Sequence, residues 1–170
     1  MQVLSPVLAR WPWFALVASA AMLGAAHAFE TFGHLAPCTL CLRQREAYWI
    51  AGTIALVGCG LDLTPLRART GRLVAALLML AFLYGLGYAV YHAGAEQKWW
   101  PGPKECSGGL TAVKAADLDA LLKGAKINIP HCDEIAWSFL GLSMAAWNGL
   151  ISLGLAVASG LATFRKATPA

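Results

Sequence analysis

The sequence predicts an all-α membrane protein, a bundle of four transmembrane helices joined by two outward loops. Hydrophobic residues make up 58% of the 170 residues and charged residues 13%, whereas an average soluble domain has roughly 45–50% apolar and about 25% charged residues. An open sheet is excluded in lipid because its edge would leave backbone groups unpaired. Four windows lack Asp, Glu, Lys and Arg, namely 11–29, 47–61, 73–95 and 135–164.

Three of these windows reach the roughly 20 residues that a spanning helix needs, and the second is short by about five. The second can span if it includes the residues from Cys41 onward, which puts Arg43, Arg45 and Glu46 near the headgroups. We therefore expect one integral membrane domain. Its helices are expected at about 11–29, 42–62, 72–93 and 136–164, and its outward loops at about 30–41 and 94–135.

Basic residues in the short flanking segments give the orientation. They are Arg10, Arg67, Arg69, Arg72, Arg165 and Lys166. These flanks, and with them both chain ends, are expected on the cytoplasmic side. The second outward loop carries five lysines and six acids, a near-balanced mixture typical of a translocated loop. The net charge of +4 is modest, and we expect no nucleic-acid partner.

Two segments leave alternatives open. The first window ends in Ala26-His27-Ala28, a small-x-small sequence that a signal peptidase would cleave, although Trp11-Pro12-Trp13 is typical of an interfacial belt. Residues 112–124 have helical spacing and form a short amphipathic helix in this prediction. That helix would lie on the outer membrane face or pack on the end of the bundle.

The five cysteines divide by side of the membrane. Cys38, Cys41, Cys106 and Cys132 fall in the outward loops, and Cys59 falls near the inner end of the second helix. The orientation was derived without the cysteines, so this distribution is independent support for it. Disulfides persist in oxidising compartments such as the periplasm. Thiol–disulfide chemistry is therefore expected for the four outward cysteines, and packing for Cys59.

Cys38 and Cys41 form a Cys-x-x-Cys motif that leads directly into the second helix. A thiolate at a helix N-terminus is stabilised by the free N–H groups and the helix dipole, which favours a redox-active pair. A static disulfide and half of a zinc site are the alternatives. A zinc site would require a second Cys-x-x-Cys or a His pair at ligand spacing, so we predict no metal site.

Two further residues are candidates for the same site. Arg45 follows Cys41 by four residues, so both lie on one helix face. An arginine at membrane depth is costly, and it would hold a thiolate, polarise a ligand's carbonyl oxygen or snorkel to the surface. His92 ends the third helix on the outer side, as an interfacial cap or as a ligand.

In combination, these stretches resemble the disulfide bond formation protein B family, the inner-membrane quinone reductases that reoxidise periplasmic disulfide oxidases. The matching residues are Pro37 to Arg45, then Cys106, then Cys132 to Met144. The resemblance covers the whole four-helix layout, and its specificity comes from the ordered combination of motifs. The sequence Trp99-Trp100-Pro101-Gly102-Pro103 departs from the family pattern.

The resemblance implies roles for the cysteines. Cys106 would be attacked by the reduced partner, and Cys132 would be its disulfide mate. Cys38 would exchange with that pair, and Cys41 would be the thiolate that faces the quinone.

The resemblance also implies a cofactor, a partner and a location. Arg45 and His92 would lie next to the quinone, a ubiquinone or a menaquinone. The partner would be a periplasmic thioredoxin-fold disulfide oxidase. The chain would be a thiol:quinone oxidoreductase of the bacterial inner membrane, with cytoplasmic termini and periplasmic active cysteines. Exchange between disulfides needs an attacking thiolate, an accessible sulfur and a good leaving thiolate, and all of these are available in such a relay.

Two other functions fit the same features. One is a relative of the vitamin K reductase family, whose active Cys-x-x-Cys is expected near the end of the bundle and not at the start of the second helix. The other is a membrane scaffold or metal-binding protein whose outward cysteines form structural disulfides.

Overall fold

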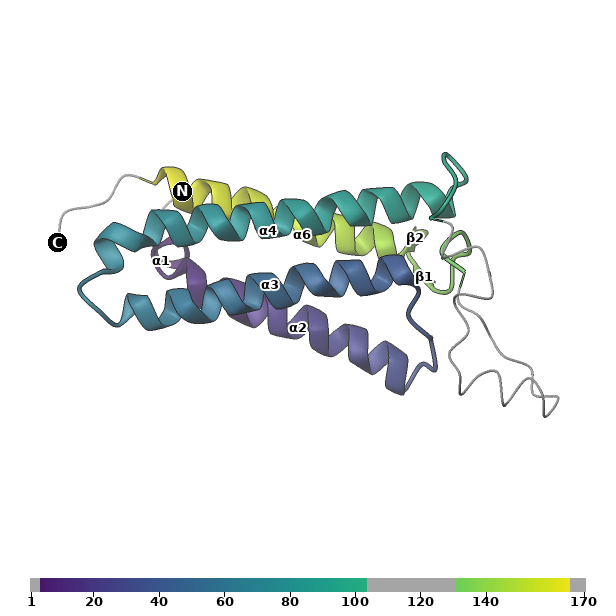
Figure 1. The fold of residues 1–170 in the computed structure, drawn as a ribbon, viewed down its shortest axis with the longest axis horizontal. Coiled ribbons are helices and arrows are strands. Elements are labelled where there is room, and N and C mark those ends of the chain that lie inside the picture. The colour runs from purple at the N-terminus through teal and green to yellow at the C-terminus, as the bar shows by residue number, and fades with distance from the viewer. Residues whose placement is uncertain (1–3, 104–130, 166–170) are drawn as a thin grey trace.

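The computed structural model describes residues 4–103 and 131–165, and the regular secondary structure in this part of the chain is helical apart from one small hairpin (Figure 1). The elements are α1 Leu4–Ala9, α2 Trp11–Thr31, α3 Thr39–Asp62, α4 Arg67–Glu96, β1 Ser138–Phe139, β2 Leu142–Ser143 and α6 Met144–Phe164.

The helices α2, α4 and α6 are long and apolar enough to cross a membrane. The 24-residue helix α3 is about 36 Å long, which also suffices, but its first turns contain Arg43, Arg45 and Glu46. The chain is therefore a membrane protein in which the polar residues of α3 lie near one end of the bundle.

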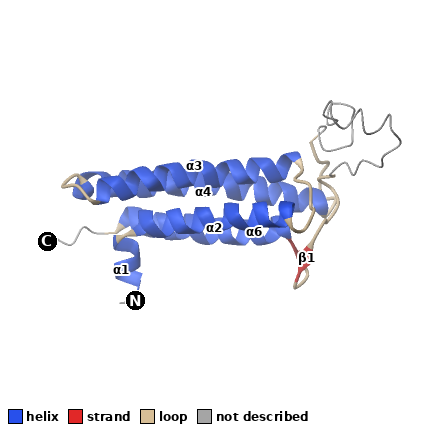
Figure 2. Ribbon diagram, turned by 90° about the horizontal axis from the view of Figure 1, so that it is seen from below, coloured by secondary structure: helices blue, strands red, loops and turns tan. Residues whose placement is uncertain are grey.

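The four long helices form one bundle in which α4 packs on α3 and α6, and α2 packs on α3. One end of the bundle contains the α2–α3 connection, the end of α4 and the β1–β2 hairpin; we call it the hairpin end (Figures 1 and 2). The opposite end contains α1, the α3–α4 connection and the end of α6; we call it the terminal end. The four long helices of the described chain thus bring Leu4 and Arg165 to the same end of the bundle.

Small residues fill much of the interface between the helices. Ala15, Ala51 and Ala55 are fully buried, together with the larger Leu78 and Phe82. Small residues let helix backbones approach closely where lipid supplies no hydrophobic driving force between helices. Large apolar side chains instead cover the outside of the bundle, including Val17, Leu56, Val57, Leu73, Leu80, Val90, Leu150 and Val157.

Gly58 lies at one of these close helix–helix contacts. A Cβ placed on Gly58 would lie 2.6 Å from Val74 Cγ1 and 3.0 Å from Pro12 Cβ. We therefore expect Gly58→Ala to lower the free energy of unfolding in detergent by about 1–3 kcal/mol through overpacking. Gly60→Ala is the matched control, because a Cβ there meets no described atom within 4 Å. Equal unfolding free energies for the two variants would contradict this packing.

The structure differs from the sequence prediction at the start of three helices. The third helix, α4, begins at Arg67 and not near 72. The last helix begins at Met144 and not near 136, because β1 and β2 pair as an antiparallel hairpin. Leu140 and Gly141 form its turn with φ values of 52° and 78°, the left-handed conformations of a type I′ hairpin turn. Ser143 then caps α6 by accepting a hydrogen bond from the Ala146 N–H.

The second long helix of the prediction, α3, begins at Thr39, three residues earlier than expected, because the Cys38 side chain caps it. The amphipathic helix expected at 112–124 lies outside the described residues.

Candidate redox site at the hairpin end of the bundle

The first turn of α3 brings the two cysteines of the Cys-x-x-Cys motif together. Cys38 is the extended N-cap residue, with φ −77° and ψ 171°, and its Sγ accepts a hydrogen bond from the Cys41 N–H at 3.3 Å. The two Sγ atoms are 2.8 Å apart. Both cysteines are free thiols, so a small movement of one side chain would close a disulfide between them.

Cys132 lies in the same cluster. It is fully buried and packs with Cys38 and Leu40, although 94 residues separate the two cysteines in the chain. Cys132 is disulfide-bonded, and its bonding partner is not among the described residues; Cys106, the predicted mate, lies outside them. The structure therefore brings one disulfide-bonded cysteine against one cysteine of the free pair.

The two sulfurs of the free pair differ in protonation. The side-chain hydrogen bond with Cys41, and after it burial, raise the pKa of the Cys38 thiol well above its ordinary value. Cys38 is therefore the sulfur of the reduced pair that keeps its proton, and it needs a base before it can act as a nucleophile.

This difference predicts an order of alkylation in the reduced protein. Iodoacetamide should modify Cys41 about tenfold faster than Cys38 at neutral pH, because the thiolate is the reactive form and Cys38 is only 5% exposed. Because its pKa is raised, the Cys38 rate should increase only at pH values above those that ionise an ordinary thiol. Mass spectrometry of peptides after short exposures measures both rates. Faster modification of Cys38 would contradict the assignment.

His92 reaches the pair from α4. Its Nε2 lies 3.7 Å from Cys38 Sγ and 3.8 Å from Glu96 Oε1, and its Nδ1 lies 2.8 Å from Gln44 Nε2. The ring is 5% exposed. His92 is thus a buried neighbour of Cys38 and does not lie on the surface.

The ligand atoms of Cys38, Cys41 and His92 all lie within 4.8 Å of one another, close enough to hold a metal ion. Ligand spacing along the chain does not predict this group, because its histidine comes from another helix, 51 residues beyond Cys41. Two thiols and an imidazole are suitable zinc ligands.

A chain of polar side chains continues from His92 into the bundle, and the sequence analysis missed it. Asn148 Nδ2 donates to Gln44 Oε1, Tyr48 Oη donates to Asn148 Oδ1 at 2.6 Å, and Tyr48 Oη lies 3.0 Å from Ser152 Oγ. All are buried. The sequence signal for this network is Asn148, an amide inside the uncharged window 135–164. Polar groups inside a membrane protein are rarely without function.

Arg45 lies one helical turn beyond Cys41 and is anchored to α2. Its Nη1 is 2.5 Å from the Glu30 carboxylate, and its Nη2 donates to the Ala26 carbonyl oxygen at 3.1 Å. Its side chain is 15% exposed, whereas that of Arg43, which pairs with Glu46, is 53% exposed. Arg43 has the geometry of a surface arginine, and Arg45 does not.

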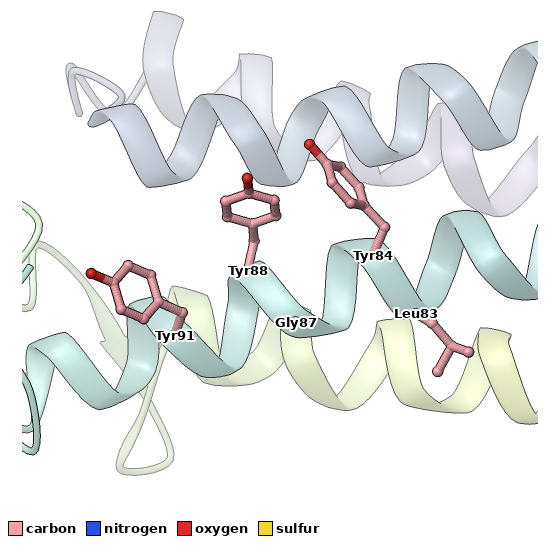
Figure 3. Close-up of a pocket in the computed structure, with 5 residues that line it drawn as sticks. All are labelled: Leu83, Tyr84, Gly87, Tyr88 and Tyr91. Carbon is pink, nitrogen blue, oxygen red and sulfur yellow. The ribbon is translucent and has the colours of Figure 1, made fainter. Parts of the chain in front are cut away.

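Two apolar grooves lie on α4 and α3. A groove of about 340 Å³ on α4 is lined by Leu83, Tyr84, Gly87, Tyr88 and Tyr91, whose tyrosine rings project from successive turns (Figure 3). Tyr88 and Tyr91 also pack on the cluster of Cys38, Leu40 and Cys132. A second groove of about 320 Å³ lies on α3 and is lined by Trp49, Ile50, Thr53 and Ile54.

Cys59 does not join the site. It is a buried free thiol near the other end of α3, 18 residues or about 27 Å along the helix from Cys41. Its sulfur is too distant to exchange with the pair.

The sequence matches the family model described as Disulfide bond formation protein DsbB over residues 9–162. The chain belongs to this family. A protein named disulfide bond formation protein B from Azoarcus sp. is 32% identical over 142 residues, which cover 81% of this chain and 80% of the relative. One of the same name from Pasteurella multocida is 34% identical over 141 residues, which cover 81% of this chain and 76% of the relative. The relative from Dechloromonas aromatica is 30% identical over 167 residues, which cover 91% of this chain and 92% of its own. No solved structure matches.

Membership of the DsbB family confirms the resemblance that the sequence motifs indicated. It makes the chain a membrane protein of disulfide bond formation, with disulfide-forming oxidoreductase activity. The Cys-x-x-Cys at the start of α3 and the Cys132 disulfide are the groups in the described part of this DsbB protein that can carry such chemistry.

Proposed function

We propose that the protein oxidises a periplasmic thioredoxin-fold disulfide oxidase and passes the electrons to a quinone. The observation that carries this proposal is the packing of the disulfide-bonded Cys132 against Cys38, at one end of the bundle, beside Cys41. Two cysteine pairs in contact can exchange without any metal or chain of aromatic groups, because disulfide exchange needs only a thiolate and an accessible sulfur.

Electrons move in pairs along this route. The partner's dithiol attacks Cys106 and reduces the Cys106–Cys132 disulfide. The resulting Cys106–Cys132 dithiol then reduces the Cys38–Cys41 disulfide, and the Cys106–Cys132 disulfide re-forms. The Cys38–Cys41 dithiol then loses two electrons and two protons as its disulfide closes again. A bound quinone supplies the two-electron, two-proton acceptor for that last step.

The residues around Cys41 fit a quinone, either ubiquinone or menaquinone. Cys41 is half-buried and lies on the same face of α3 as Arg45 and Trp49, each four residues from the last. The Arg45 guanidinium favours negative charge on a nearby thiolate or ring oxygen. The apolar groove that begins at Trp49 suits an isoprenoid tail, and His92 is a second polar group near the ring.

The basic residues support an inner-membrane orientation with the hairpin end in the periplasm. Arg67, Arg69 and Arg72 begin α4, and Arg10 lies between α1 and α2, so all four lie at the terminal end (Figure 1). Basic residues in short flanks stay cytoplasmic. This orientation gives cytoplasmic termini and periplasmic cysteines.

The test uses the full-length protein in lipid nanodiscs with a reduced thioredoxin-fold oxidase and a soluble ubiquinone or menaquinone analogue. We expect one quinone reduced per partner disulfide formed. A partner variant that lacks its second cysteine should be trapped as a mixed disulfide on Cys106. Partner oxidation without quinone reduction would refute the proposal, and trapping only on Cys38 would refute the assigned order.

Metal binding is a second candidate, favoured by the mutual approach of Cys38, Cys41 and His92. Zinc would then bind the reduced protein and not the oxidised one, because a closed disulfide offers no thiolate. Equilibrium dialysis of both forms against zinc distinguishes the two functions. Tight zinc binding together with absent quinone reduction would favour the metal site.

A further inference from the structure

Five buried polar side chains connect the redox sulfur to the interior of the bundle. From Cys38 the contacts run to His92, Gln44, Asn148, Tyr48 and Ser152. They come from α3, α4 and α6, and each of the five is at most 8% exposed. Buried polar groups are costly unless they are hydrogen-bonded, and here each has a partner on another helix.

In the structure, the hydrogen bonds of this network all donate in one direction, toward His92. Tyr48 donates to Asn148, Asn148 donates to Gln44, and the Gln44 amide nitrogen can only donate to His92 Nδ1. Nδ1 is then the acceptor, so the neutral ring carries its hydrogen on Nε2, 3.7 Å from Cys38 Sγ. This direction suits a Cys38 sulfur that accepts a hydrogen bond, in a disulfide or as a thiolate.

The reverse direction satisfies the same groups. The oxygen and nitrogen of an amide exchange places by a half-turn, so Gln44 Oε1 can accept from His92 Nδ1 while Gln44 Nε2 donates to Asn148 Oδ1. Asn148 Nδ2 then donates to Tyr48 Oη, which donates to Ser152 Oγ, 3.0 Å away. The bare Nε2 of His92 then faces Cys38 and can accept its proton.

We infer that Gln44 is a positioning residue for the redox step: its amide, backed by Asn148 and Tyr48, holds His92 so that Nε2 takes the proton of Cys38. The inference rests on the proposed function, in which Cys38 and Cys41 close a disulfide in every turnover. A nucleophile, a base and a third group that orients the base are the usual parts of such a site.

The protons and electrons balance as follows. The Cys41 proton goes to the quinone acceptor, the Cys38 S–H bond breaks as its proton moves to His92 Nε2, and the Cys38 sulfur forms the S–S bond with Cys41. The dithiol is oxidised, and the two electrons go to the quinone acceptor of the proposed function. Glu96 Oε1, 3.8 Å from Nε2, stabilises the protonated ring until its proton leaves to water or to the acceptor.

The first measurement follows Cys38 alone and needs neither quinone nor partner. In a Cys41→Ser background, the rate of Cys38 alkylation against pH reports its ionisation. We expect Gln44→Leu to raise the pH midpoint of Cys38 alkylation by about one unit, a tenfold change in the ionisation equilibrium. Without the Gln44 amide, the His92 ring is no longer held so that its Nε2–H donates to the Cys38 thiolate. Ser159→Ala is the matched control, since it breaks a buried hydrogen bond with Trp11 at the terminal end and should leave the midpoint unchanged.

The second measurement is turnover against pH in the protein with all its cysteines. Gln44→Leu should lower kcat about tenfold, within the range of general-base effects, with little change in quinone KM. Gln44→Glu keeps an acceptor for His92 Nδ1 and should restore most of kcat. Its carboxylate also stabilises the protonated ring, so the pH below which activity is lost should move upward.

Unchanged alkylation midpoints and an unchanged pH profile in both Gln44 variants would overturn the inference. A loss of kcat that Gln44→Glu does not restore, with an unshifted midpoint, would show a merely structural role and also overturn it. The proposed function would stand in both cases if wild-type protein reduces quinone. Conversely, a shifted midpoint in protein that reduces no quinone would refute the proposed function and leave the contact of Gln44, His92 and Cys38 intact.

Discussion

Cys41→Ser should reduce steady-state quinone reduction by at least about 1000-fold, because a hydroxyl neither forms the disulfide with Cys38 nor serves as a comparable thiolate nucleophile. The two Sγ atoms are 2.8 Å apart in the structure, and the variant retains only one of them. The measurement is quinone absorbance in nanodiscs with excess reduced partner.

The same variant should still react once with the partner, since the Cys132 disulfide is untouched. A single-turnover experiment should therefore show partner oxidation without quinone reduction, which separates a broken relay from an unfolded protein. Cys59→Ser is the control and should keep normal turnover, because Cys59 is buried about 27 Å along α3 from Cys41. Normal activity in Cys41→Ser would remove this residue from the relay.

Arg45→Ala should raise the quinone KM about tenfold to 100-fold, the effect of losing a hydrogen bond from a charged group of about 1.5–3 kcal/mol. The guanidinium is only 15% exposed and lies one turn from Cys41, so water replaces it poorly. Partner oxidation in a single turnover should hardly change, because the arginine is proposed to act on the quinone. The measurement is initial rate against quinone concentration at saturating partner.

Two controls separate the charge of Arg45 from its structural contacts. Glu30→Gln breaks the ion pair between α2 and α3 but keeps the guanidinium, and it should leave the quinone KM near the wild-type value. Arg43→Ala removes an exposed arginine from the same helix and should have no effect. Quinone kinetics unchanged in Arg45→Ala would exclude Arg45 from the quinone site.

Much of the fold follows from local sequence properties. The apolar windows fix the long helices because lipid offers no partner for unpaired backbone groups, and the Cys-x-x-Cys before an apolar run marks the start of α3. The hairpin at 138–143 was not predicted, since its residues continue an apolar window without charge. It exists because Leu140 and Gly141 adopt positive φ values, a tertiary outcome that hydropathy does not encode.

The candidate site also combines features that local sequence predicts with features that it does not predict. Local sequence properties predict the membrane setting, the family, the cysteine motif at a helix start and the arginine one turn beyond it, because these depend on composition and on spacing along one helix. The packing of the helices, in contrast, brings Cys132 against Cys38 and His92 to the same sulfur, and it joins Gln44, Asn148 and Tyr48 to His92 by hydrogen bonds. These groups are 48 to 104 residues apart in their contacts, and their approach depends on which helix faces turn inward when the bundle packs.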